Sequence, residues 1–167
     1  MKKILKYTAL LVVALLLGSC SKDEPGNTST VNLAGEWAVT VDAVIGGETI
    51  EDAFGLGEFM IITYNTNADD GKEMWINDLE QFWNFIVKVP CNPSARTFGA
   101  PGFRPDAANE GVEVEVTEGS VVPRGAISPT GKPVDAISFR VNFSDDENGV
   151  DYYLVHGYRR TGFDGYL

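Results

Sequence analysis

The sequence predicts an all-β protein whose strands form an antiparallel barrel or, as the alternative, a β-sandwich. Many short segments alternate apolar with polar residues, and residues typical of tight turns separate these segments. No segment shows the periodicity of an amphipathic helix. Short strands joined by tight turns are typical of barrels and sandwiches, and we expect about eight of them.

The first half of the expected barrel contains four strands and the start of a fifth. Trp37, Val39 and Val41 alternate with more polar residues, which is the pattern of a half-buried strand. The expected strands span residues 37–43, 59–64, 73–78 and 82–89, and a fifth begins at residues 97–98. Residues 47–57 are rich in glycine and acids and predict a loop. Pro90 ends the fourth strand, because proline has no N–H to donate to a neighbouring strand.

The second half begins with residues 99–111, which show no pattern and predict a long loop. Strands are expected at residues 112–116, 120–127, 137–143 and 150–160. The clearest alternation is that of residues 137–143, where every second residue is Ile, Phe or Val. Asn148-Gly149 predicts the tight turn of a hairpin between the last two strands.

The first twenty residues have the order of a secretory signal, with lysines, then an apolar run, then small residues. The apolar run is shorter than the roughly 20 residues that a membrane span needs. It ends in Gly18-Ser19-Cys20, which resembles the lipobox of bacterial lipoproteins, although a plain cleaved signal is the alternative. We therefore expect residues 1–19 to be a signal peptide and Cys20 to carry palmitate-type acyl chains that anchor the protein to a membrane.

Residues 21–30 contain no apolar side chain to bury and predict a flexible tether. The expected organisation is a lipidated cysteine and tether over residues 20–32 and a β-barrel domain over residues 33–167. Ser21-Lys22-Asp23-Glu24 resembles the tag that sends some lipoproteins to the outer face of the outer membrane. We expect a lipid-anchored protein of the outer membrane, exposed at the cell surface, unless these residues are only a solvated linker.

The chain is acidic, with a formal charge of −11 that becomes −14 when a signal with three lysines is removed. This charge argues against a nucleic-acid partner and against contact with anionic lipid head groups, so the membrane is reached through the acyl chains alone. If Cys20 is acylated, Cys91 has no disulfide partner within the chain.

The sequence offers little support for an enzyme, and no catalytic, metal or cofactor residue is predicted. His156 is the one histidine, and no nucleophile motif of the G-x-S-x-G type is present. A lone strand histidine is typical of a structural residue, and Cys91 lacks a basic neighbour to activate it. The acidic residues 145–149 are explained by a hairpin turn rather than by a calcium site. A hydrolase that uses carboxylates stays an alternative.

Several motifs resemble a family of bacterial lipoproteins described as lipid-binding hydrolases. They are Ile62-Thr63-Tyr64-Asn65-Thr66, Glu73-Met74-Trp75-Ile76-Asn77-Asp78, Phe82-Trp83, Lys88-Val89-Pro90, Phe143-Ser144-Asp145-Asp146 and Gly157-Tyr158-Arg159-Arg160-Thr161-Gly162-Phe163. The resemblance implies a calycin or lipocalin-like barrel and a lipid ligand, and it supplies no catalytic residue. Gly35-Glu36-Trp37 also resembles the opening of lipocalins, in which an arginine near the last strand packs on the tryptophan and closes the barrel. Arg159 and Arg160 are the candidates for this role.

The most favoured function is binding of a small apolar or amphipathic, lipid-like ligand, and an accessory module of a surface complex is an alternative. We expect the ligand to be lined by Trp83, Phe85, Phe139, Tyr153 and Gly157. The short side chains of Ala43, Ala136 and Gly157 are expected to leave room inside the barrel. An anionic ligand would need Arg140, Arg159 or Lys88 at the rim.

Overall fold

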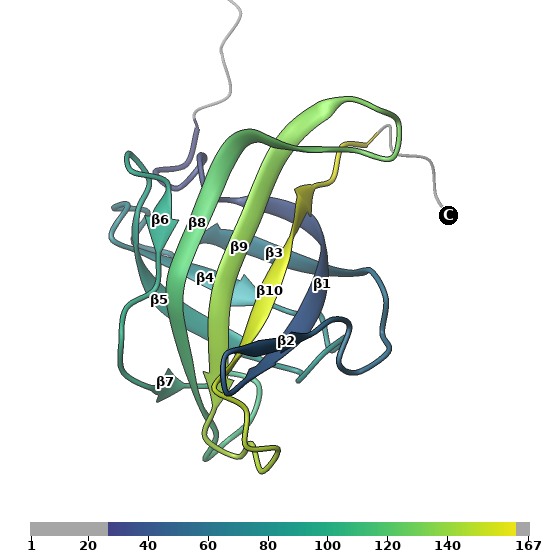
Figure 1. Cartoon of the computed structure of the whole chain (residues 1–167). Helices are drawn as coiled ribbons and strands as arrows, with labels where there is room; N and C mark the ends of the chain where they lie inside the picture. Colours follow the sequence, from purple (N-terminus) through teal and green to yellow (C-terminus); the bar gives the residue numbers. More distant parts are fainter. Residues whose placement is uncertain (1–26, 163–167) are drawn as a thin grey trace, which may run out of the picture.

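The computed structural model describes residues 27–162, and every helix or strand assigned in this part of the chain is a β-strand (Figure 1). The strands are β1 (Gly35–Ile45), β2 (Glu48–Ile50), β3 (Phe59–Asn65), β4 (Glu73–Asn77), β5 (Ile86–Asn92), β6 (Thr97–Phe98), β7 (Arg104–Pro105), β8 (Glu113–Ile127), β9 (Pro133–Phe143) and β10 (Tyr152–Arg159). Residues 27–162 include no helix that is long and apolar enough to cross a membrane. The predicted signal peptide and Cys20 lie outside the described residues.

Eight of the strands close into an antiparallel barrel, so the barrel prediction is confirmed and the sandwich alternative is wrong. The order around the barrel is β10-β9-β8-β6-β5-β4-β3-β1, and β1 pairs with β10 to close it. This closing pair runs from Trp37 opposite Arg159 to Val44 opposite Tyr152. The two remaining strands lie outside the ring, β2 beside β1 and β7 beside β8. Closure leaves the barrel without an unpaired edge strand.

Alternating side chains from all eight barrel strands fill the interior. In β9 the inward positions Ile137, Phe139, Val141 and Phe143 are between 1% and 4% exposed. They belong to one apolar cluster that also takes in residues of β1, β3, β4, β5, β6, β8 and β10. The period-2 pattern seen in the sequence therefore marks the core face correctly.

Five strands differ from the expectation, and one of them is β9, which begins at Pro133 rather than at residue 137. β5 begins at Ile86 rather than at residue 82, and it continues through Pro90, whose carbonyl accepts a hydrogen bond from Gly99 at 2.8 Å. β8 is one strand where two were expected, because bulges between Thr117 and Ser120 and between Val122 and Ala126 interrupt its alternation. The short strands β2 and β7 lie in segments that were predicted to be loops.

The two ends of the barrel are different. The chain enters β1 from a turn at residues 28–33, and the hairpin between β8 and β9 projects beyond the barrel at this same end (Figure 1). Ser29 donates hydrogen bonds to Asp69 at 2.8 Å, so the last part of the predicted tether contacts the barrel here. Residues 46–58, 78–85 and 144–151 gather at the opposite end. We call the end at which the chain enters β1 the closed end, and the opposite end the mouth.

Candidate functional site

Five aromatic side chains meet at the mouth, and we call them the mouth cluster. They are Phe54, Phe82, Trp83, Phe143 and Tyr153. The rings of Trp83 and Phe143 are stacked, with centroids 4.5 Å apart and planes 2° from parallel. Phe54 lies 5.1 Å from Phe82 and 5.4 Å from Tyr153. Two loops and the ends of β9 and β10 thus bring together residues that are far apart in the chain.

A single buried carboxylate shapes the loop that carries Phe82 and Trp83. Asp78 is 1% exposed. Its two oxygens accept hydrogen bonds at 2.8–3.1 Å from the backbone N–H groups of residues 80, 82, 83, 84 and 85. A carboxylate holding this many donors turns the chain back on itself, so residues 82–85 form a loop and not the start of β5.

The segment that carries Phe54 is held to the outside of the barrel by two further carboxylates. Asp42 accepts a hydrogen bond from the Asp52 N–H at 3.0 Å, and the Asp52 carboxylate accepts one from the Gly57 N–H. Asp52 and Gly57 both have positive φ, at 44° and 63°. These turns place Phe54 over the outer side of the mouth cluster, where its side chain is 40% exposed.

Three more exposed apolar side chains lie in the strand ends and the loop at the mouth. Ile45, Ile50 and Leu56 are between 41% and 49% exposed. Ile50 lies opposite Ala43, which in turn lies opposite Tyr153, and directly paired residues share one face of a sheet. The inner face of the barrel therefore continues outwards at the mouth as an apolar surface that water reaches.

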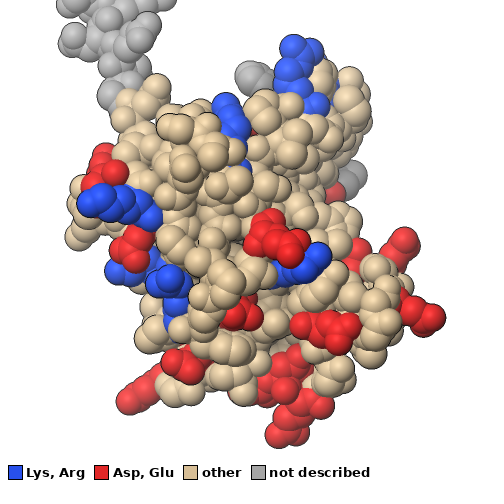
Figure 2. Space-filling model, turned by 60° about the vertical axis from the view of Figure 1, so that its left-hand side comes forward, with Lys and Arg blue, Asp and Glu red and all other residues tan. Residues whose placement is uncertain are grey.

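The mouth is acidic. Its loops, residues 46–58, 78–85 and 144–151, contain four, two and four Asp or Glu residues and no Lys or Arg. Red side chains accordingly predominate over the lower part of the molecule in Figure 2. The three cations considered for the rim lie elsewhere. Lys88 pairs with Glu73 and Arg140 with Glu118 on the outer face, and Arg159 lies at the closed end, so none of the three meets the condition for an anionic ligand at the rim.

At the closed end, the guanidinium carbon of Arg159 lies 4.4 Å from the centre of the Trp37 ring. Arg159 also donates to the Ala34 carbonyl at 2.5 Å and faces Asp135 at 3.5 Å. Burial lowers the pKa of Arg159, and Asp135 opposes this effect. The Trp37 indole donates to the Thr63 hydroxyl at 2.8 Å. Of the two arginine candidates, Arg159 makes the contact with the tryptophan.

Arg160 points away from this arrangement, on the outer face. It pairs with Glu36 at 3.6 Å, and its guanidinium lies 2.8 Å from the Met60 sulfur. Trp37 is 0% exposed, so Arg159 and Trp37 together seal the end of the barrel at which the chain enters.

The predicted ligand-lining residues occupy two different levels of the barrel. Phe85, Phe139 and Tyr153 are each 1% exposed and contribute to the packed core. Trp83 packs against that core from the mouth, as a half-buried residue. A ligand role for these residues stays a prediction.

The three short side chains were expected to leave room inside the barrel, but they do not do so. A Cβ atom added to Gly157 would lie 2.0 Å from the carbonyl oxygen of Ala38, so this glycine allows β10 to approach β1 closely. Ala43 is buried in the core cluster, 4% exposed. Ala136 precedes the inward residue Ile137 in β9 and therefore lies on the outer face.

Two residues with reactive side chains are placed away from the mouth cluster. The His156 Nε2 atom lies 2.9 Å from Asp42 and 3.4 Å from the Thr40 hydroxyl. A catalytic triad needs the hydroxyl and the carboxylate on different ring nitrogens, and here both face the same one.

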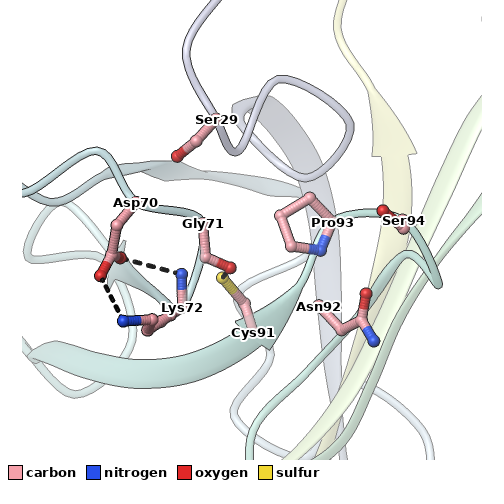
Figure 3. Close-up of a pocket in the computed structure, with 8 residues that line it drawn as sticks. All are labelled: Ser29, Asp70, Gly71, Lys72, Cys91, Asn92, Pro93 and Ser94. Atoms are coloured by element: carbon pink, nitrogen blue, oxygen red, sulfur yellow. Dashed lines mark hydrogen bonds and ion pairs between the residues drawn. The ribbon is translucent and has the colours of Figure 1, made fainter.

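Cys91 lies beside Gly71 in a shallow hollow near the closed end (Figure 3). Its sulfur is 3.5 Å from the Gly71 carbonyl oxygen. Burial, with Asp70 and Glu73 nearby, raises the pKa of the Cys91 thiol. The thiol therefore stays protonated and unreactive at neutral pH. The residues that the structure describes contain no group of three or more His, Cys, Asp or Glu arranged to hold a metal ion.

A family model with the description "lipid-binding putative hydrolase" matches residues 22–164, which is most of the chain and the whole described barrel. No curated protein matches the chain. The family's description agrees with a site built from apolar side chains.

Proposed function

Because the chain belongs to the family of lipid-binding putative hydrolases, we propose that it binds the apolar chain of a lipid-like ligand at the mouth of the barrel. The observation that carries the proposal is the apolar surface there. Beside the mouth cluster, Ile45, Ile50 and Leu56 are all more than two-fifths exposed. Exposed, contiguous apolar surface on an otherwise acidic protein is typical of a binding site.

The ligand binds at the mouth rather than deep inside. Core side chains such as Phe85 and Phe139 fill the interior, and a side chain at the inward position of Gly157 would collide with β1. At the mouth, Phe54 is the outermost ring of the cluster, and the loop that carries it is free of strand pairing from Glu51 to Glu58. Displacement of Phe54 uncovers Phe82 and Tyr153 for an alkyl chain. Each methylene that leaves water contributes about 0.8 kcal/mol.

The proposal includes anchoring to a membrane. Residues 1–19 act as a signal peptide, Cys20 is acylated, and residues 20–32 connect it to the barrel domain, so that the protein is a lipoprotein at the outer face of the outer membrane. The barrel supports this arrangement because the chain enters at the closed end. An anchor on that side leaves the mouth directed away from the membrane. The test is Cys20→Ala, which should release the protein from the membrane fraction; normal processing together with unchanged fractionation would contradict it.

The binding experiment uses a chain that begins at Ser21, which keeps every strand of the closed barrel. It is titrated with dodecyl maltoside below its micelle concentration, and binding is followed by tryptophan emission and by native mass spectrometry. We expect saturable binding of one molecule. Phe82→Ala should weaken it, and Trp75→Ala, on the outer face of β4, should not. Failure to bind by both readouts would contradict the proposal and favour the interaction-module alternative.

Hydrolysis through His156 or Cys91 is not part of the proposal. The same chain should show no ester cleavage that His156→Ala or Cys91→Ala removes. Activity that is lost with either change would show that the protein is a nucleophilic hydrolase.

A further inference from the structure

We propose that the mouth selects amphiphiles with a positively charged ammonium head group and rejects anionic ones such as fatty acids. This inference rests on the proposed function and narrows its ligand class. It follows from the charges around the mouth cluster and from the chemistry of the aromatic rings themselves.

The carboxylates of the mouth are not neutralised by the protein. Asp145 accepts a hydrogen bond from the Trp83 indole at 3.1 Å, Asp151 one from the Gly47 N–H at 3.2 Å, and Glu58 one from the Tyr158 hydroxyl at 3.1 Å. All of these donors are uncharged. Among residues 27–162, no Lys or Arg forms an ion pair with a carboxylate of the three mouth loops. The negative potential at the mouth is therefore available to a ligand.

One basic side chain outside these loops, Arg104, belongs to β7, which pairs with β8. It lies opposite Val114 of β8, and its Nε atom is buried and has no hydrogen-bond partner among the described residues. The other candidate cations already have acidic partners, as in the pair of Arg140 with Glu118 at 2.6 Å. An anionic head group at the mouth would thus meet several carboxylates and find no free cation in the loops.

The rings of the mouth cluster favour the same sign of charge. The face of an aromatic ring carries partial negative charge and attracts ammonium groups. Phe54 is 40% exposed, and the Trp83 indole is oriented by its bond to Asp145. A ligand whose alkyl chain replaces Phe54 on Phe82 and Tyr153 places its head beside these rings and the carboxylates around them.

The test compares three amphiphiles with the same twelve-carbon chain: dodecyltrimethylammonium, dodecyl maltoside and dodecyl sulfate, each below its micelle concentration. Titration calorimetry of the chain beginning at Ser21 should give an affinity about tenfold higher for the ammonium compound than for the sulfate. The neutral compound should lie between them. The difference should shrink when salt is raised from about 0.01 to 0.5 M, because salt screens charges across the mouth.

Variants that remove negative charges show which carboxylates cause the preference for the ammonium compound. Glu51 and Glu147 are exposed mouth carboxylates. Glu51→Gln together with Glu147→Gln should reduce the ratio of the two affinities about threefold. The matched control, Glu36→Gln with Asp70→Asn, removes the same charge from the closed end and should leave the ratio unchanged.

The outcomes separate the two proposals. Equal or tighter binding of dodecyl sulfate would overturn the head-group inference and leave lipid binding intact. If Arg104→Gln then abolished the preference for the sulfate, the anionic head group would be bound by that arginine instead. If none of the three compounds binds, the proposed function itself fails.

Discussion

The indole of Trp83 lies flat on the ring of Phe143, with the two centroids 4.5 Å apart. This contact joins the loop between β4 and β5 to the end of β9, which is 60 residues further along the chain. Because the Trp83 N–H also donates to Asp145, the loop after β9 is held to the same side chain. The mouth is thus a set of loops fastened together by aromatic contacts.

Replacement of Trp83 should affect both stability and binding. Trp83→Ala removes the stack and the bond to Asp145, and it should cost about 2 kcal/mol of unfolding free energy in urea, since ring pairs contribute beyond their buried area. The affinity for dodecyl maltoside should fall as well. Trp75→Ala is the control because it removes an indole from the outer face. Unchanged affinity in the Trp83 variant would show that this ring is not part of the site.

The closed end should be a main source of stability. Trp37→Ala should cost about 3–5 kcal/mol, as expected for a fully buried large aromatic residue. Arg159→Ala should cost less, about 1–3 kcal/mol, through the lost contact with the ring and the unpaired Ala34 carbonyl. Arg160→Ala should have a smaller effect, since its ion pair with Glu36 is exposed to solvent. An equal loss for the two arginines would contradict the different roles assigned to them.

Asp78 should be required for the shape of the mouth. Asp78→Asn replaces one acceptor oxygen with a donor that faces backbone N–H groups, and we expect a loss of about 2–4 kcal/mol. Trp83 should then become more exposed, which a red shift of tryptophan emission reports. Glu80→Gln, on the exposed side of the same loop, should change neither property. A stable Asp78→Asn protein with unshifted emission would show that the loop is held in another way.

Stability at high pH should depend on Tyr153. Burial raises the pKa of Tyr153 to about 12 from the usual 10. The unfolded chain therefore loses this proton first, and the stabilisation present below pH 10 is lost as the pH rises to about 12. Tyr153→Phe has no such proton. The fall in unfolding free energy between pH 10 and 12 should be shallower in this variant than in the original protein, and an identical fall in both would contradict the assignment.

The barrel was predictable wherever a strand has one buried face. Residues 137–143 alternate without interruption, and β9 lies there. The sequence predicts two strands where β8 is one. Glu118 and Arg124 adopt positive φ at the bulges of β8, and the alternation of side chains does not reveal these bulges. The predicted start of β5 is too early because Trp83 and Phe85 continue the alternation of apolar and polar residues. The Asp78 carboxylate accepts hydrogen bonds from five N–H groups and so keeps that segment out of the sheet, and such bonds leave no periodic signal in the sequence.

The site was harder to predict than the fold. Phe54 lies in a segment without a pattern, and its contact with Tyr153 spans 99 residues. Arg159 opposite Trp37 was foreseeable because the first and last strands of a barrel pair with each other. The positions of Lys88, Arg140 and Arg159 away from the rim were not foreseeable, since the sequence does not show which face and which end of the barrel each side chain occupies.

The most direct test of lipid binding at the mouth uses the three tryptophan indole N–H signals in a proton–nitrogen NMR spectrum. One tryptophan lies at the mouth (Trp83), one at the closed end (Trp37) and one on the outer face (Trp75). Titration with dodecyl maltoside should move the Trp83 signal to saturation, because the ligand lies next to an indole that donates to Asp145, and should leave the Trp75 signal in place. Movement of the Trp75 signal with a stationary Trp83 signal would contradict binding at the mouth.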